Sequence, residues 1–402
     1  MNISILFSPL GIFSGYSTGL ATITIQQVIM IMLGLFFAYL SISKKYEPLL
    51  LLPLAFGMIL ANIPGANLSA YDAPVYDEFG NIIRQGGLVH FWYQGILRVI
   101  FPPMIFLCIG TMTDMGPLIA NPRIALVGLG GQLGIFVVFG GAIVLGDWLA
   151  PIIPGFDGFT FKEAASIAII GSSDGPTSIF AATRLAPHLL PTIAIAAFSY
   201  MALVPFIQPP IMKMLITKKE RVVVMPPARN VTKRQKIVFC LGTTIFVLLL
   251  VPTAGALIGM LMLGNLIRES GVTDRFVETL QKPLLNLLTM LVAASIGASA
   301  TADRFLTPTT LFVVFLGLVA FIFGTIGGIL IAKLLYWVTR GKVNPLIGNS
   351  GVSAMPMAAR ISQRMGLQYD PQNHLLMHAM GPIVSSTILS AIVAGLFIAF
   401  YG

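Results

Sequence analysis

The chain has 402 residues, of which 56% are hydrophobic and only 10% are charged, and its mean hydropathy is +0.90. This composition excludes a soluble domain of this length and predicts a polytopic α-helical membrane protein. The formal net charge of +9 would point to nucleic acid in a soluble protein. Here the basic excess lies mostly in short loops, as in the cytoplasmic loops of membrane proteins, so no nucleic-acid partner is expected.

Apolar stretches along the chain predict its membrane helices. In chain order they cover residues 25–40, 49–63, 97–119, 124–145, 193–212, 237–251, 254–267, 284–298, 311–335 and 383–400. Several are shorter than the ~20 residues of a simple span, so tilted, buried or half-spanning helices are expected too. The predicted fold class is therefore all-α, a multi-pass transmembrane bundle.

One basic segment, residues 213–236, divides the chain. It is rich in lysine and arginine and contains the single acid Glu220, which predicts a cytoplasmic connector. The chain then reads as a first membrane repeat (residues 1–212), this connector, and a second membrane repeat (residues 237–402).

The two halves share landmarks in the same order, which predicts an internal duplication. Residues 57–62 recur loosely as 259–265, residues 109–122 as 296–308, and residues 170–173 with 181–184 as 347–350 with 358–360. If the repeats are inverted, the basic loops all fall on the side of the connector, whereas a parallel repeat would place several of them outside. The distribution of charge therefore favours inverted repeats.

Each half also contains an apolar region that is interrupted by polar and Gly/Pro-rich residues, at 171–178 and at 344–360. Helix breaks within a bilayer leave backbone groups unpaired and are tolerated where they lie in protein or line a cavity. A pair of breaks at corresponding positions indicates the substrate site of an ion-coupled transporter.

The first break carries an intramembrane carboxylate, Asp174, which is unfavourable in a bilayer and implies a function. Three roles are open: ligand of a cation, proton relay, or structural partner of Arg184. Neighbouring hydroxyls, including that of Ser173, and carbonyls freed at the break are hard oxygen donors, which suit Na⁺ better than a transition metal.

The second break supplies neutral oxygens that match those of the first. They come from Asn344, Asn349, Ser350 and Ser353, although the same residue types also form ordinary turns. Two further positions have alternative readings: Tyr200 is either a packing residue or a site residue, and Arg360 with Arg364 form either a cytoplasmic anchor or a clamp for an anion.

Four strings in the sequence resemble one family. They are Asp-Gly-Pro-Thr-Ser-Ile-Phe at 174–180, Lys-Lys-Glu-Arg at 218–221, Gly-Asn-Ser-Gly-Val-Ser-Ala-Met-Pro-Met-Ala-Ala-Arg at 348–360, and Leu-Met-His-Ala-Met-Gly-Pro at 376–382. Together they are similar to the β subunit of the sodium-pumping biotin-dependent decarboxylases, which act on oxaloacetate, methylmalonyl-CoA, glutaconyl-CoA or malonate.

The resemblance implies a carboxybiotin decarboxylase in the bacterial cytoplasmic membrane, which couples release of CO₂ and consumption of a proton to outward transport of Na⁺. The implied partners are a biotin carrier domain, a carboxyltransferase α subunit and a small membrane γ or δ subunit.

 A homo-oligomer of the chain is expected as well.

The resemblance also assigns residues to roles. The family's functional carboxylate corresponds to Asp174 and its functional tyrosine to Tyr200, while its second motif corresponds to Asn344, Gly348, Ser353 and Arg360. Together with the oxygen donors around the breaks, these positions predict that Na⁺ is bound by a set drawn from both breaks: Asp174, Ser173, Asn344, Gly348 and Ser353. Tyr200, Ser353 and Arg360 are the predicted catalytic residues, with Arg360 and Asn349 at the carboxybiotin.

One departure from the family pattern lies in the last apolar stretch. After Gly381-Pro382 the family would have Asn followed by small residues, whereas this chain has Ile383-Val384-Ser385-Ser386. The last helix is therefore expected to line the site differently. The rival function is a secondary carboxylate transporter or antiporter, coupled to Na⁺ or H⁺, without chemistry of its own, and only the four strings favour the decarboxylase.

Overall fold

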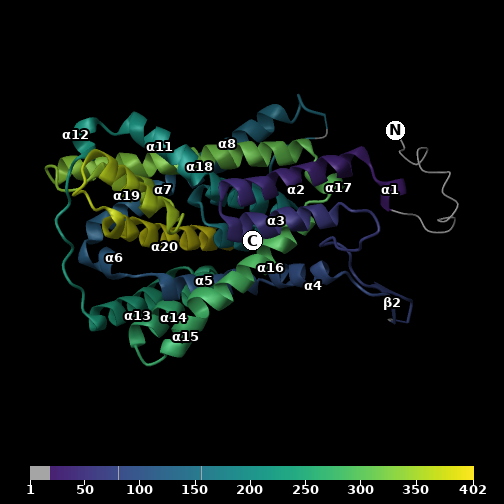
Figure 1. The fold of residues 1–402 in the computed structure, drawn as a ribbon, viewed down its shortest axis with the longest axis horizontal. Coiled ribbons are helices and arrows are strands. Elements are labelled where there is room, and N and C mark those ends of the chain that lie inside the picture. Colours follow the sequence, from purple (N-terminus) through teal and green to yellow (C-terminus); the bar gives the residue numbers. More distant parts are fainter. Residues whose placement is uncertain (1–18, 80, 155) are drawn as a thin grey trace. The chain divides into compact units, whose positions relative to one another are not determined.

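The computed structural model describes residues 19–79, 81–154 and 156–402, and residues 1–18 of the predicted first repeat lie outside them. The described chain is mostly helical and has almost no sheet (Figure 1), which confirms the all-α class. Its one sheet is a short antiparallel hairpin of β1 (Val75–Tyr76) and β2 (Ile82–Arg84). The chain forms two compact units, each of which combines segments from both halves of the sequence.

The first unit comprises residues up to 101 together with residues 286–311. Its helices are α1 (Gly19–Thr22), α2 (Ile25–Lys44), α3 (Pro48–Ala61), α4 (Leu88–Leu97), α17 (Ala302–Phe305) and nearly all of α16 (Leu285–Ser299). Helices α2 and α3 pack on each other as an antiparallel pair joined by a short turn.

Within this unit, α3 and α16 cross with their backbones in close contact. A Cβ on Gly57 would collide with the backbone of α16, and a Cβ on Gly297 would collide with the backbone of α3. Beside the crossing, the Asn62 amide donates to the carbonyl of Ala300 at 2.9 Å, and its oxygen accepts from the N–H of Ala302 at 3.0 Å. The asparagine thereby satisfies backbone groups where α16 ends.

The second unit contains the rest of the chain. In its first half lie α5 (Phe101–Met112), α6 (Gly116–Ala120), η2 (Pro122–Ile124), α7 (Ala125–Gly131), α8 (Leu133–Leu149), α9 (Phe161–Ala168), η3 (Ile169–Ser172), α10 (Gly175–Leu185), η4 (Pro187–Leu189), α11 (Leu190–Leu215) and α12 (Lys218–Arg221). In its second half lie α13 (Lys233–Leu250), η5 (Pro252–Ala254), α14 (Gly255–Ser270), α15 (Asp274–Thr279), η6 (Leu280–Leu284), α18 (Pro308–Val338), η7 (Pro345–Gly351), α19 (Met357–Tyr369) and α20 (Leu376–Tyr401).

A crossing of the same kind joins α5 and α14 in the second unit. A Cβ on Gly110 or on Gly264 would collide with the opposite backbone, and the Asn265 amide donates to the carbonyl of Thr113 at 2.7 Å. The repeat pattern pairs Gly57 with Gly259, but a Cβ on Gly259 would meet no atom of the described residues within 4 Å. In the second half the close contact is made by Gly264.

The described chain has five helices that are long and apolar enough to cross a membrane, or seven if each of two bent helix pairs counts as one span. The five are Ile25–Lys44, Pro122–Leu149, Asp274–Ser299, Pro308–Val338 and Leu376–Tyr401. The protein is therefore a multi-pass membrane protein.

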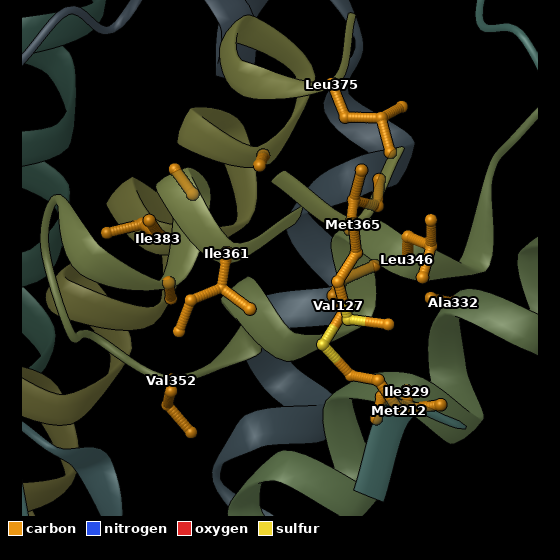
Figure 2. Close-up of a cluster of buried hydrophobic side chains, with 14 of the residues drawn as sticks. Val127, Met212, Ile329, Ala332, Leu346, Val352, Ile361, Met365, Leu375 and Ile383 are labelled. Carbon is orange, nitrogen blue, oxygen red and sulfur yellow. The ribbon is translucent and has the colours of Figure 1, made fainter. Parts of the chain in front are cut away.

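The main apolar core of the second unit surrounds the second break. Figure 2 shows its buried side chains, among them Val127, Leu346, Val352, Ile361 and Ile383, which come from different elements and gather around η7. Because the break is buried in protein on all of these sides, its irregular backbone is shielded from lipid.

Candidate functional site

The two breaks meet in the second unit, as the sequence predicts. The first break lies between α9 and α10 and includes η3, and the second consists of η7 and the residues that precede α19. The N–H of Ser353 donates to the carbonyl of Ser172 at 2.8 Å, so the broken segments are joined directly through their backbones.

Glycines allow the long helices to approach both breaks. A Cβ on Gly131 would collide with the carbonyl of Gly351 in the second break, and a Cβ on Gly171 would come within 3.0 Å of the α8 backbone. Gly348 is equally confined, because a Cβ there would come within 2.5 Å of the Cα of Ile329 on α18. Close backbone contacts with α7, α8 and α18 therefore hold the two breaks in place.

Asp174 lies at the N-terminus of α10 and is 5% exposed. One of its carboxylate oxygens accepts a 2.7 Å hydrogen bond from the hydroxyl of Thr177, and Ser390 of α20 contributes a further side-chain interaction. A helix N-terminus favours a negative charge at this position. Arg184 is exposed at the other end of α10 and forms no ion pair with Asp174 in the structure, so the structural pair is the least supported of the three readings.

Ser173, next to Asp174, combines two unfavourable features. Its backbone is left-handed, with φ of 56°, a conformation that is rare for residues other than glycine. Its hydroxyl is buried and has no hydrogen-bond partner among the described residues. Strain and an unpaired polar atom at one residue are typical of functional sites, and they fit a hydroxyl that binds a ligand.

The hydroxyls of Ser353 and Ser386 connect the second break to α20. The Ser353 hydroxyl donates to that of Ser386 at 3.0 Å, and the Gln132 amide donates to the same oxygen at 3.2 Å. Ser386 and Ser390 are four residues apart and therefore share one face of α20. Gln132 and Ser390 are not among the residues predicted from the sequence. The signal in the sequence is the four-residue spacing of Ser386 and Ser390, which places two hydroxyls on one face of the last helix.

Asn344, predicted as an ion ligand, makes contacts with the connector. Its amide nitrogen donates to the carbonyls of Arg221 and Val223, at 3.2 and 2.7 Å, and its side-chain oxygen accepts from the N–H of Leu346 at 2.9 Å. The residue therefore caps the start of η7 and holds it against the connector.

Asn349, predicted at the carboxybiotin, has its amide paired within the protein. Its nitrogen donates to the side-chain oxygen of Gln208 and to the carbonyl of Ala358, both at 2.9 Å, and its oxygen accepts from the hydroxyl of Ser362 at 2.5 Å. The Gln208 amide donates back to the Asn349 backbone at 3.0 Å. These contacts indicate that Asn349 fixes the shape of η7.

The remaining predicted residues occupy separate places. Tyr200 of α11 is 6% exposed; its hydroxyl donates to the carbonyl of Val314, and its ring packs against Gly317 of α18. Arg360 and Arg364 lie one turn apart on α19, and both are exposed.

The connector motif has a structural role that the sequence analysis did not predict. The guanidinium of Arg221 donates to the carbonyls of Lys213 and Ile216 at the end of α11 and to the hydroxyl of Tyr369 on α19, over 2.5 to 2.9 Å. Its neighbour Glu220 lies 3.5 Å from the ammonium of Lys333 on α18. The motif therefore ties three helices together at one end of the unit.

Charged groups also gather beside the connector. Lys236 lies 2.7 Å from Asp114 and 3.3 Å from Glu269. Burial would raise the pKa of Asp114, but hydrogen bonds from the Lys236 ammonium and from a backbone N–H outweigh it and lower this pKa below its ordinary value. A pocket of about 230 Å³ nearby is lined by Arg123, Arg229 and Lys342, in keeping with the predicted cytoplasmic side.

Comparisons with known proteins agree on one family. The model of a family described as the Na⁺-transporting oxaloacetate decarboxylase beta subunit matches residues 26–401. The chain is 50% identical to the methylmalonyl-CoA decarboxylase subunit beta of Veillonella parvula, over 95% of each chain. It is 48% identical to the glutaconyl-CoA decarboxylase subunit beta of Acidaminococcus fermentans, over 96% of each.

A relative from a third kind of decarboxylase is nearly as similar. The oxaloacetate decarboxylase beta chain of Klebsiella pneumoniae is 44% identical over 95% of this chain and 96% of its own. These matches cover both breaks, the connector and the last helix. The chain belongs to the family of beta subunits of Na⁺-transporting decarboxylases.

Proposed function

We propose that the chain decarboxylates carboxybiotin and couples this reaction to the outward transport of Na⁺. The observation that carries the proposal is the direct contact of two broken segments beside a buried carboxylate, in a chain whose relatives are decarboxylase subunits. A transporter without chemistry is not favoured, because the similarity to those subunits extends over nearly the whole chain.

Na⁺ is the transported substrate, and Asp174 is its charged ligand. The strained residue beside it, Ser173, offers a buried hydroxyl that has no hydrogen-bond partner in the described part of the chain, and Ser353 offers a hydroxyl from the second break. These oxygens are hard donors suited to Na⁺. Asn344 and Gly348 are the further proposed ligands from the second break, and both also fix η7, against the connector and α18 respectively.

In the chemical step the bond between the ureido nitrogen of biotin and the carboxyl carbon breaks. CO₂ leaves, and the electron pair stays on the nitrogen, which then takes up a proton. Tyr200 and Ser353 are the proposed donors, since each carries a hydroxyl in the interior of the unit. Na⁺ arriving beside such a hydroxyl would lower its pKa and favour release of the proton. Arg360 is the proposed ligand of the carboxylate, through charge-assisted hydrogen bonds.

Alternating access is proposed to come from two inverted repeats. The paired crossings support this: α3 with α16 and α5 with α14 each join one segment from each half, through the same combination of glycines and an asparagine. Gly130 of α7 and Gly327 of α18 also contact each other's backbones closely, which adds a third glycine-mediated contact between the two halves. Inverted repeats of this kind are the usual basis of alternating access in transporters.

The proposed partners follow from the family. A biotin carrier brings carboxybiotin to the connector side, and a carboxyltransferase subunit loads that carrier. We include a small membrane γ or δ subunit and a homo-oligomer of this chain in the proposed complex.

The test uses the purified complex in sealed vesicles. Addition of the acyl substrate is expected to give Na⁺-dependent release of CO₂ and simultaneous movement of ²²Na⁺ across the membrane. A complex that moves Na⁺ without releasing CO₂ would support the transporter instead.

A further inference from the structure

Gln132 lies at an irregular point within a membrane span. It separates α7 from α8 in the span Pro122–Leu149. Its N–H donates to the carbonyl of Leu129 at 3.1 Å, and its own carbonyl accepts from the N–H of Ile135 at 3.0 Å as well as from that of Phe136 at 3.3 Å. The bonds to Leu129 and from Ile135 span three residues, whereas a regular α-helical bond spans four, so the helix tightens here. Such a turn within a helix often marks a hinge at a functional site.

The side chain of Gln132 has an unpaired oxygen. The residue is 1% exposed, and its amide nitrogen donates to the carbonyl of Gly128 and to the hydroxyl of Ser386, both at 3.2 Å. A backbone carbonyl can only accept a hydrogen bond, so the orientation of the amide is fixed by Gly128. The side-chain oxygen is then buried without a hydrogen-bond partner among the described residues. A buried carbonyl oxygen is rarely left in this state.

This oxygen belongs to the region where the breaks meet. Ser386 accepts hydrogen bonds from both Gln132 and Ser353, and Ser353 is joined to Ser172 of the first break. Gln132 is thus connected through one serine to the second break, but it comes from a helix that belongs to neither break.

We infer that the side-chain oxygen of Gln132 is a ligand of the transported cation, next to the hydroxyls of Ser353 and Ser386. The inference rests on the proposed Na⁺ transport and adds a residue from a third element to the site. An amide oxygen and two hydroxyls are neutral, hard donors, which suit an alkali cation. Because Gln132 lies at the tightened turn, movement of α7 against α8 changes its distance from the two serines.

Two substitutions separate the oxygen from the nitrogen of this amide. Gln132→Met removes both polar groups at similar length, whereas Gln132→Glu keeps a side-chain oxygen but loses the N–H donors. Thr325→Val is the matched control, because it removes a buried hydroxyl that donates only within its own helix, to Phe321 at 3.0 Å. All three are made in the intact complex.

The measurements are the Na⁺ concentration for half-maximal decarboxylation and the rise in melting temperature of the complex on addition of Na⁺. We expect Gln132→Met to raise the half-maximal concentration about 10-fold, equivalent to ~1.4 kcal/mol, and to reduce the thermal shift. Gln132→Glu should stay within about threefold of the parent, and Thr325→Val should be unchanged. Gln132→Asn, which withdraws the oxygen by one methylene, should resemble Gln132→Met and serves if the latter does not assemble.

Two results would overturn the inference. One is unaltered Na⁺ dependence in Gln132→Met or Gln132→Asn. The other is an equal rise of the half-maximal Na⁺ concentration in Gln132→Met and Gln132→Glu, which would assign the role to the amide nitrogen. Failure of the proposed function is distinguishable, because the parent complex would then show no Na⁺-dependent decarboxylation.

Discussion

The backbone N–H of Ser353 donates to the carbonyl oxygen of Ser172 at 2.8 Å. Helix breaks leave such groups unpaired, and inside a bilayer an unpaired group is unfavourable by several kcal/mol. Here one break supplies the donor and the other the acceptor. The position of each break therefore depends on the other, and on the close approach of the helices around them.

The first prediction concerns that close approach. Gly131→Ala places a Cβ against the carbonyl of Gly351, so the helix must move away from the second break. We expect the free energy of unfolding to fall by at least the ~1–3 kcal/mol that is typical of overpacking. The melting temperature of the solubilised complex should fall accordingly. Gly140→Ala on α8 is the control, because a Cβ there meets nothing within 4 Å, and a similar loss in that variant would contradict the explanation.

The second prediction concerns the charge at the first break. Asp174→Asn keeps the size of the side chain and can still accept from Thr177, but it removes the negative charge. We expect Na⁺-dependent decarboxylation to fall by about 100-fold or more, equivalent to ~2.7 kcal/mol, in a complex that still assembles. Thr177→Val removes only the 2.7 Å hydrogen bond to the carboxylate and should have the smaller effect. Normal activity with unchanged Na⁺ dependence in Asp174→Asn would rule out the role as ion ligand.

The third prediction concerns the proton. Tyr200→Phe keeps the ring against Gly317 and deletes the hydroxyl that donates to Val314, so the loss of stability should be about 1 kcal/mol. Loss of a proton donor should slow turnover by roughly 10²–10⁴-fold. Rates are measured at saturating Na⁺, with carrier binding as the control for assembly. Ser353→Ala is tested in the same way, and if both variants keep more than about a tenth of the rate, a bound water becomes the better candidate.

The sequence predicted those features of the site that are energetically unfavourable within a membrane. A carboxylate and two helix breaks are unfavourable in a bilayer, so Asp174 and both interrupted segments are visible in the sequence without coordinates. Ser353 could be placed in the second break for the same reason. The meeting of the breaks follows from the repeat pattern, and the backbone bond between Ser172 and Ser353 agrees with it.

The sequence did not predict which polar residues are already satisfied by other parts of the protein. Asn344 and Asn349 are predicted as an ion ligand and a cofactor ligand, and in the structure their amides are bonded to the connector and to Gln208. Conversely, Gln132 looks like one polar residue in an apolar stretch, and only the packing of α7 against α20 leaves its oxygen unpaired. In both cases, whether a polar side chain is already hydrogen-bonded depends on residues that are far away in the sequence.

The fourth prediction tests the connector motif. Arg221→Lys keeps the charge but replaces the guanidinium fork, so its bonds to the carbonyls of Lys213 and Ile216 and to Tyr369 cannot all be kept. We expect the free energy of unfolding to fall by about 2–3 kcal/mol, because each charge-assisted hydrogen bond contributes ~1.5 kcal/mol or more. The melting temperature of the complex measures it. Arg234→Lys, at an exposed position of α13, should leave that temperature unchanged, and equal shifts in the two variants would contradict the structural role.

The last prediction separates a specific arginine from general positive charge on α19. Arg360 and Arg364 are one turn apart and both exposed, so removal of either changes the local charge by the same amount. If Arg360 binds the carboxylate of carboxybiotin, Arg360→Ala should lower kcat/KM for the loaded carrier by about 10- to 100-fold, as expected for a hydrogen bond to a charged group worth ~1.5–3 kcal/mol. Arg360→Lys should recover only part of the loss, because an ammonium cannot form the bidentate pair. Arg364→Ala should stay close to the parent. Equal losses in Arg360→Ala and Arg364→Ala, relieved to the same extent by added salt, would assign both residues to long-range attraction of the carrier.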